Sequence, residues 1–234
     1  MATERHDEDS SSRNDSLVLR ITEGGAAGEI VQIDLSDGSS FFIPVTMVPA
    51  TLPAVGERFF KGAYEDLLSA SESYAAQRKA LDLLASREQS RARLIMKLEK
   101  RGFSALSISH ALENLEAAGK LDDRRFAEVW ITGRLRRNPE GRAKLFSGLL
   151  SQGVSREVAN EALSALDSDD EDAALRHAAE KLQARGRTSP KKMMRALRAK
   201  GFPYRASLKE VFRRFSLSDE NDLRELFDDS PPAD

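Results

Sequence analysis

The sequence predicts a mainly α-helical protein: tandem three-helix repeat units in an elongated, curved array, preceded by a small N-terminal β-meander. Three observations lead to this fold class. Two apolar positions followed by a glycine recur at one spacing, and the glycines Gly102, Gly153 and Gly201 lie 51 and 48 residues apart. Apolar residues follow helical spacing from Tyr64 onward. Before that point, residues 17–61 alternate in the manner of strands.

The glycine-ended helix is the most regular part of each unit. Its apolar pairs are Leu94 and Leu98, Leu145 and Leu149, and Met193 and Leu197. Twelve residues before each glycine stands a residue that can cap the helix: Ser90, Gly141 and Ser189. The glycine supplies the left-handed residue that ends the helix. In each unit we predict one helix before the glycine-ended helix and one after it. The preceding helices are expected at about 78–86, 125–137 and 173–185.

The N-terminal region predicts three strands. The strand-like runs are Leu17–Thr22, Glu29–Leu35 and Phe41–Ile43, with a further short piece at Arg58–Phe60. Asp37-Gly38 predicts a type I′ hairpin turn, which needs positive φ at both central residues. The run from Gly24 to Gly28 is interpreted as a hairpin loop, because it lacks the spacing of a dinucleotide-binding loop.

The expected organisation has six parts. These are a disordered tail (1–16), a small β-rich domain (17–62), a linking helix with the first repeat (63–121), the second repeat (122–166), the third repeat (167–217) and an acidic disordered tail (218–234). The sequence contains no apolar run of about 20 residues, the length needed to cross a membrane, and it contains no cysteine. We therefore expect a cytoplasmic protein.

Charge is segregated along the chain although the total is only −2. Residues 173–215 contain thirteen Lys and Arg against Glu180 and Glu210, a net charge of +11. The compensating acids cluster at 167–172 and after Ser218, so the acidic tail could mask the basic third repeat. Such a basic body predicts a polyanionic or acidic partner.

Other residues have structural interpretations. Asp122 and Asp123 directly precede a predicted helix, where carboxylates cap backbone N–H groups. Trp130 is expected in the core, whereas Tyr204 is a candidate for stacking on a base. The three histidines have no metal-binding spacing, and no nucleophile or carboxylate pair has a catalytic context. We predict no enzyme activity, no metal and no cofactor.

The centre of the chain resembles the RecX family of recombinase regulators. The resemblance rests on the run Arg87 to Phe103, with Ser90, Leu94, Leu98 and Gly102, and on the junction Gly119-Lys120-Leu121-Asp122-Asp123-Arg124-Arg125-Phe126-Ala127. The second unit adds Gly141, Leu145, Leu149 and Gly153-Val154, and the third adds Lys192, Leu197 and Lys200-Gly201-Phe202. Three positions depart from the family pattern: Arg93, Gly148 and Gln152.

The resemblance implies a regulator that binds the RecA protein and lies in the groove of the RecA filament on single-stranded DNA. It implies modulation, in the inhibitory direction, of ATP hydrolysis, filament growth and strand exchange, within recombination, DNA repair and the SOS response. We expect contact with the phosphate backbone of DNA, without sequence specificity. We also expect the protein to be a monomer. Candidate contacts are Lys97, Arg101, Arg124, Arg125, Arg134, Arg136, Arg137, Arg142, Lys191, Lys192, Arg195, Arg198, Lys200 and Tyr204.

Within this set, the arginines around Asn138–Gly141 are interpreted as a cluster on an exposed turn between helices. Two other functions stay open. Three-helix units with a basic helix could belong to a helix-turn-helix DNA-binding protein. The chain could also be an α-helical repeat adaptor for an unrelated protein.

Overall fold

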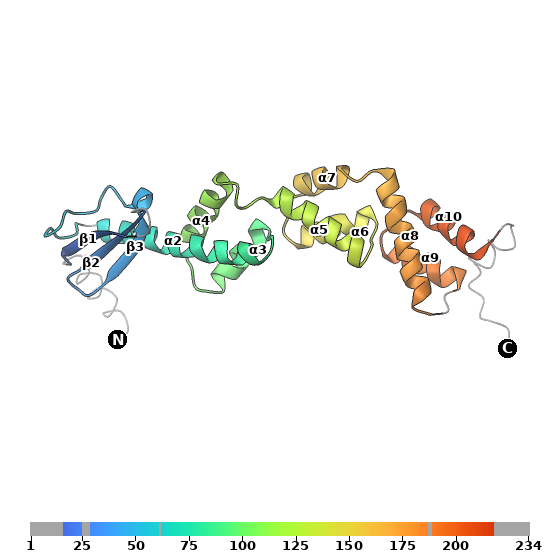
Figure 1. Cartoon of the computed structure of the whole chain (residues 1–234), viewed down its shortest axis with the longest axis horizontal. Coiled ribbons are helices and arrows are strands. Elements are labelled where there is room, and N and C mark those ends of the chain that lie inside the picture. Colours follow the sequence, from blue (N-terminus) through green and yellow to red (C-terminus); the bar gives the residue numbers. More distant parts are fainter. Residues whose placement is uncertain (1–15, 25–28, 61, 187–188, 218–234) are drawn as a thin grey trace, which may run out of the picture. The chain divides into compact units, whose positions relative to one another are not determined.

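The computed structural model describes residues 16–24, 29–60, 62–186 and 189–217. Its elements are β1 (Val18–Gly24), β2 (Ile30–Leu35), β3 (Ser40–Pro44), the 3-10 helix η1 (Val45–Met47), α2 (Ala63–Ser86), α3 (Arg91–Glu99), α4 (Ala105–Ala117), α5 (Asp123–Arg137), α6 (Arg142–Ser151), α7 (Arg156–Ser164), α8 (Ser168–Ala184), α9 (Pro190–Ala199) and α10 (Tyr204–Phe215) (Figure 1). The mainly helical class with an N-terminal three-stranded meander is confirmed.

The chain divides into two compact units. The first contains the residues up to Arg87 and Leu94–Leu121, and the second contains Glu88–Arg93 and the residues from Asp122 onward. We call α5–α7 the second repeat and α8–α10 the third repeat, and both lie in the second unit. The acidic stretch 218–234 and its predicted masking role lie outside the described residues, as do residues 1–15 of the N-terminal tail.

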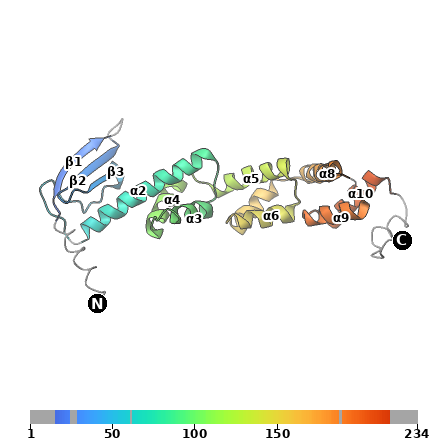
Figure 2. The same ribbon diagram turned by 90° about the horizontal axis from the view of Figure 1, so that it is seen from below.

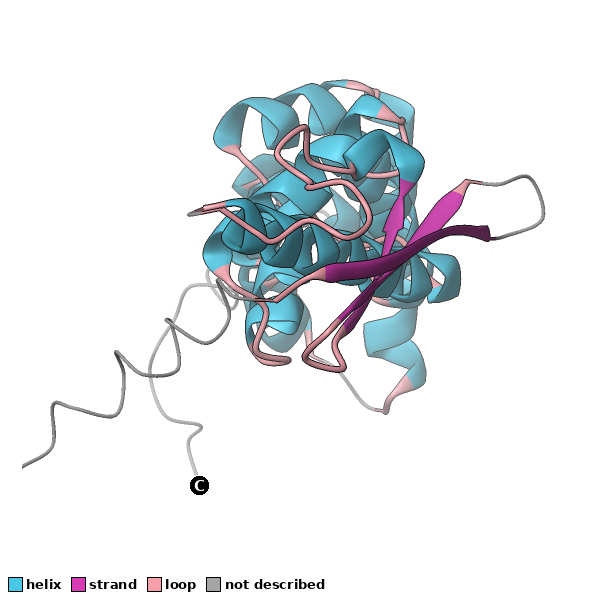
Figure 3. Cartoon of the chain, turned by 90° about the vertical axis from the view of Figure 1, so that its left-hand side faces the viewer, coloured by secondary structure: helices cyan, strands magenta, loops and turns pink. Residues whose placement is uncertain are grey.

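The three strands form an antiparallel sheet in the order β1-β2-β3 (Figure 3). Burial alternates along β2, where Val31, Ile33 and Leu35 face the core, as predicted. The β2–β3 turn differs from the prediction: Gly38 has positive φ, and no other described residue of that turn does. The Asp37 carboxylate instead accepts a hydrogen bond from the Ser39 N–H at 2.8 Å, a local Asx bond that holds a longer loop. The type I′ assignment was therefore wrong.

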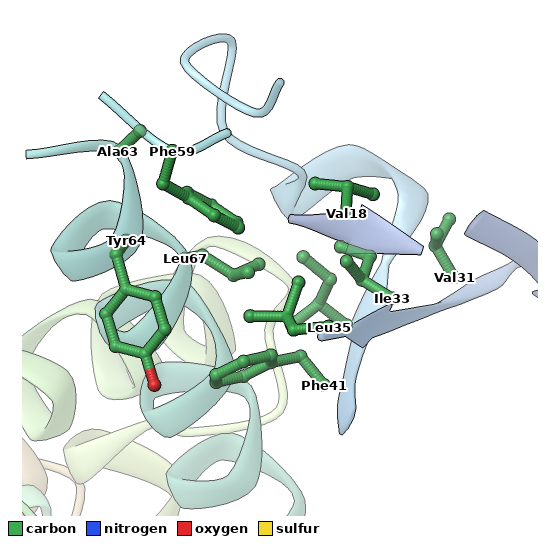
Figure 4. Packing of buried hydrophobic residues seen from close by; sticks show 10 residues of the cluster. Val18, Val31, Ile33, Leu35, Phe41, Phe59, Ala63, Tyr64 and Leu67 are labelled. Atoms are coloured by element: carbon green, nitrogen blue, oxygen red, sulfur yellow. The ribbon is translucent and has the colours of Figure 1, made fainter. Parts of the chain in front are cut away.

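One face of the sheet packs on the start of α2 (Figure 4). Tyr64 meets the rings of Phe41 and Phe59 edge-on, at centroid distances of 6.0 and 5.7 Å. Leu67, one turn further along α2, is fully buried among the strand side chains. The predicted short strand at Arg58–Phe60 amounts to one bridge, from Leu17 to Arg58.

The opposite face of the sheet carries a polar network centred on Asp34. Its carboxylate accepts hydrogen bonds from Ser40 at 2.7 Å, from Gln32 at 2.8 Å and from Arg20 at 2.9 Å. These bonds, in that order of weight, lower the pKa of Asp34 to about 2. The carboxylate is therefore ionised at neutral pH, and it joins all three strands.

Helix α2 runs unbroken for 24 residues (Figure 2), so the predicted linking helix and the predicted helix at about 78–86 are one element. Its N-terminal part covers the sheet, and its C-terminal part packs with α3 and α4 as the first repeat. Glu72 joins α2 to α4 by accepting hydrogen bonds from the Ser104 N–H at 2.7 Å and from the Ser107 hydroxyl at 2.8 Å. Partial burial opposes ionisation, but these bonds hold the pKa of Glu72 below its usual value.

The glycine-ended helix appears three times, as α3, α6 and α9. Gly102, Gly153 and Gly201 have φ of +85°, +80° and +85°. The N–H of the next residue, Phe103, Val154 or Phe202, reaches back to the carbonyl of Leu98, Leu149 or Leu197 at 3.2–3.4 Å. This is the Schellman pattern, and it confirms the predicted glycine ends. Ser90 and Ser189 cap their helices as predicted, accepting from the N–H groups of Arg93 and Lys192.

One junction geometry occurs twice within the second unit. Ser90, the cap of α3, donates its hydroxyl to the carbonyl of Gln152 at 2.6 Å. Gly141, the cap of α6, donates its N–H to the carbonyl of Lys200 at 2.9 Å. Gln152 and Lys200 each directly precede a repeat glycine. The capping position and the glycine end are thus also the surfaces through which these segments meet.

Candidate functional site

Basic side chains of the third repeat divide into those that hold the fold and those at its surface. Arg214 belongs to the first group: only 11% of its side chain is exposed, and it pairs with Glu210 at 2.6 Å. It also donates to the Gln183 side chain and to the Arg176 carbonyl. Lys181 donates to the carbonyl of Arg137, at the end of α5. These two cations complete the packing of α8.

Helix α9 presents its cations away from the core. Met193, Met194 and Leu197 are buried, and Pro190 occupies the first turn, where a missing N–H is tolerated. The predicted contact residues Lys192, Arg195 and Arg198 are exposed, and Lys191 is half-buried. Spacing of i, i+4 and i+7 places Lys191, Arg195 and Arg198 along one side of the helix.

Lys200 is a junction residue. Its Nζ donates to Asn138 Oδ1 at 2.6 Å and lies 3.3 Å from the Pro139 carbonyl. Burial lowers the pKa of Lys200, an effect that the nearby Glu140 carboxylate opposes. Contact with a partner remains a prediction for this residue, whose ammonium group already joins the third repeat to the second.

The turn that links α5 to α6 is buried, so its description as an exposed arginine turn was wrong. Pro139, Glu140 and Gly141 are buried against the third repeat. A Cβ on Gly141 would overlap the Gly201 carbonyl, which explains why only glycine fits this approach. Arg136 and Arg137 remain exposed at the end of α5.

The other predicted arginines have protein partners. These pairs are Arg124 with Glu128 at 3.3 Å, Arg125 with Glu88 at 2.7 Å, Arg134 with Glu140 at 3.6 Å and Arg142 with Glu171 at 2.6 Å. Arg101 donates to the carbonyl of Lys97 within its own helix end. Hydrogen bonding to Glu88 raises the pKa of Arg125 further, so that guanidinium stays charged.

Trp130 packs against the core of the second repeat, half-buried, in line with its predicted core role. The Arg134 guanidinium lies over its ring, 5.1 Å from the centroid. Any side chain larger than hydrogen at Gly148 would overlap this indole, which gives a physical reason for the departure from the family pattern there. Tyr204 is 41% exposed, and the Arg198 guanidinium lies over its ring at 5.8 Å.

Asp122 and Asp123 both act as helix caps, but of different helices. Asp122 accepts from the N–H groups of Arg124 and Arg125 at the start of α5, as predicted. Asp123 accepts from the N–H of Arg91 at the start of α3, at 2.7 Å. Burial raises the pKa of the Asp123 carboxyl. The hydrogen bonds of both carboxylates are therefore those of helix caps.

A groove of about 770 Å³ lies where the second repeat meets the α9–α10 turn. Arg142, Arg156 and Arg198 line it, together with Asn160 and Phe146. Sequence reasoning missed Arg156, Asn160 and Phe146. Arg142 and Phe146 are one turn apart on α6, and Arg156 and Asn160 are one turn apart on α7. No periodicity connects these two pairs with each other or with Arg198 on α9, because only the fold brings the three helices together.

Two classes of site are absent from the described ranges. In residues 16–24, 29–60, 62–186 and 189–217, no three His, Asp or Glu side chains converge to hold a metal ion. Within the same ranges, no helix has both the length and the apolar character needed to cross a bilayer. The chemistry that the surface does offer is recognition of negative charge by guanidinium and ammonium groups.

Comparisons with known proteins identify the repeats. Residues 122–163 match the family model described as "RecX, second three-helix domain". Regulatory protein RecX of Chlorobium phaeobacteroides is 44% identical over 89 residues, which cover 38% of this chain and 59% of that protein. Regulatory protein RecX of Treponema pallidum is 36% identical over 150 residues, which cover 63% of this chain and 90% of that protein.

A solved structure shares the fold. The crystal structure of a regulatory protein RecX superposes with a TM-score of 0.59 at 14% identity, covering 90% of this chain and 98% of the other. The sequence matches and the repeated helix architecture point in the same direction. The chain belongs to the RecX family of regulatory proteins.

Proposed function

We propose that this protein binds RecA and the RecA filament on single-stranded DNA, and that it inhibits ATP hydrolysis, filament growth and strand exchange by RecA. The observation that carries the proposal is the similarity to proteins named regulatory protein RecX. In one of them the match spans 90% of the protein's length. In this proposal the protein acts as a cytoplasmic monomer with no catalytic step of its own.

The distribution of charge supports the proposal. The exposed cations of α9 lie in a segment with a net charge of +11, while the only acids of that segment are Glu180 and Glu210. Both the phosphates of a single strand and the carboxylates of a protein surface can pair with such a helix. Arg136 and Arg137, two further predicted contacts, are exposed at the end of α5.

The direct test is ATP hydrolysis by the cognate RecA on single-stranded DNA. We expect the purified protein to slow hydrolysis at ratios well below one molecule per RecA, because blocking growth at a few sites affects many subunits. Unchanged hydrolysis at every ratio, with RecA filaments present in electron micrographs, would contradict the proposal.

A second experiment locates the contact on α9. Reversal of Lys191, Lys192 and Arg195 to Glu should weaken binding to the RecA filament by roughly 100-fold or more, since attraction becomes repulsion. The matched control reverses Arg78, Arg87 and Lys100, which are exposed in the first unit. Equal losses in the two triple variants would indicate a general charge effect in place of a contact through α9.

A further inference from the structure

The groove between the second and third repeats holds three guanidinium groups and one carboxylate. Arg142 begins α6, Arg156 begins α7, and Arg198 lies near the end of α9. Glu171 is the acid on the lining, where it pairs with Arg142. A volume of about 770 Å³ falls within the range of roughly 300–1,000 Å³ typical of ligand sites.

Arg156 is poised to bind an anion. Its guanidinium lies over the Phe146 ring, 5.5 Å from the centroid. Within the described part of the chain it makes no hydrogen bond or ion pair. Stacking on an aromatic ring uses the face of the guanidinium and leaves the N–H edge for a bidentate acceptor such as a phosphate.

The other two arginines are held in place by the fold. Arg198 donates from Nη1 to the Phe202 carbonyl at 3.1 Å while its plane lies over Tyr204. Arg142 donates to the Leu166 carbonyl at 3.0 Å and to Glu171. Their positive charges are therefore ordered on the groove before any ligand arrives, which lowers the entropy cost of binding.

We propose that this groove binds the phosphodiester backbone of single-stranded nucleic acid. The inference rests on the proposed function and deepens it, because it assigns a direct contact with the DNA strand to the junction of two repeats. Asn160 adds an amide to the lining, and Phe146 adds a half-buried ring. A cationic groove with aromatic side chains is the common design of proteins that bind single strands.

The surroundings of the groove favour an extended polyanion over a small ion. Lys191 and Arg195 continue the line of Arg198 along one side of α9, so cations recur beyond the groove itself. A nucleic-acid strand carries charges that recur in the same way, one per nucleotide. An acidic segment of a protein partner is the competing ligand, and the experiment separates the two.

The test measures binding of a fluorescein-labelled oligothymidine to the full chain, without RecA, by fluorescence anisotropy at several salt concentrations. The double variant Arg156→Gln, Arg198→Gln should bind roughly tenfold more weakly than the unaltered chain. Its log–log salt dependence should be shallower by about 1.4, since each phosphate contact with a single strand contributes roughly 0.7. The control Arg78→Gln, Lys100→Gln removes the same charge from the first unit and should change affinity less than twofold.

Each outcome decides the proposal. Unchanged affinity and salt slope in the double variant would overturn it, as would equal losses in variant and control. Loss of RecA binding with DNA binding intact would assign the groove to an acidic protein segment instead. Circular dichroism checks the fold, and Arg156→Gln alone replaces the double variant if helical content falls. Failure of RecA inhibition is scored separately, in the hydrolysis assay, so the two proposals can fail independently.

Discussion

The second and third repeats share one scaffold and differ in charge. In each, a glycine-ended helix buries its apolar pair, Leu145 with Leu149 or Met193 with Leu197. In the second repeat, four predicted arginines each pair with a different acid: Arg124, Arg125, Arg134 and Arg142. In the third repeat, Arg213 and Arg214 share Glu210, and residues 173–215 contain thirteen Lys and Arg against two Glu.

This difference shows which parts of a repeat are architectural. Apolar pairs, caps and glycine ends are common to both copies because they form the helix and its junction. Charge is free to differ where it lies on the outer surface, because a single exposed ion pair contributes little to stability. Variants can test each half of the comparison.

The largest effect is expected from the apolar pairs. Leu149→Ala and Leu197→Ala should each lower the free energy of unfolding by about 2–5 kcal/mol, because both side chains are fully buried. Trp130, the single tryptophan, reports on the second repeat by fluorescence during urea unfolding. A shift of the Trp130 transition by Leu149→Ala but not by Leu197→Ala would mean that the two repeats unfold separately.

The junction glycine should rank second. Gly141→Ala places a methyl group against the Gly201 backbone and should cost about 1–3 kcal/mol, measured by the same urea unfolding. The control is Gly133→Ala in the interior of α5, where the new methyl meets the flexible end of Arg137. We expect the control to be neutral or stabilising, since alanine favours a helix. Equal destabilisation of both would remove the close approach as the cause.

The shared acid Glu210 should give a smaller, pH-dependent effect. Burial opposes its ionisation, but the hydrogen bonds from Arg213 and Arg214 prevail and hold the pKa of Glu210 below its usual value of 4.5. The ionised carboxylate therefore stabilises the fold above about pH 4.5, and this contribution is lost as pH falls through the lower folded-state pKa. Glu210→Gln should cost about 1 kcal/mol at pH 7, with the difference vanishing in acid. A constant difference from pH 7 to pH 3 would contradict this assignment.

The exposed pair of the second repeat should contribute least. Glu128→Gln removes the partner of Arg124, and both side chains are more than half exposed. We expect a change in unfolding free energy below about 0.5 kcal/mol, decreasing as salt is added. A salt-insensitive loss above 1 kcal/mol would mean that this pair is structural.

Local sequence signals predicted the elements well because their causes are local. Ser189, Pro190 and Gly201 define α9 through capping, a tolerated missing N–H and a left-handed end, all within one short segment. The alternation of Val31, Ile33 and Leu35 likewise predicted β2 and its buried face. The turn at Asp37 failed because a side-chain hydrogen bond to Ser39 overrode the dipeptide preference.

The candidate site was predicted only in part. The sequence identified α9 as basic, and the structure exposes Lys192, Arg195 and Arg198. The sequence could not distinguish these three residues from Lys200, which carries the same charge. The Lys200 ammonium group binds Asn138 in the junction between the repeats. Partial burial of one lysine at the end of a basic helix depends on what packs against that helix.

By itself, then, the sequence determined the helix type, the helix ends and the threefold repetition, because propensity, capping and periodicity act over a few residues. Tertiary structure alone decided which cations are structural and which form a surface. It buried the turn at Gly141, and it brought Arg142, Arg156 and Arg198 to one groove. These outcomes depend on contacts between helices far apart in the chain, and no local pattern encodes such contacts.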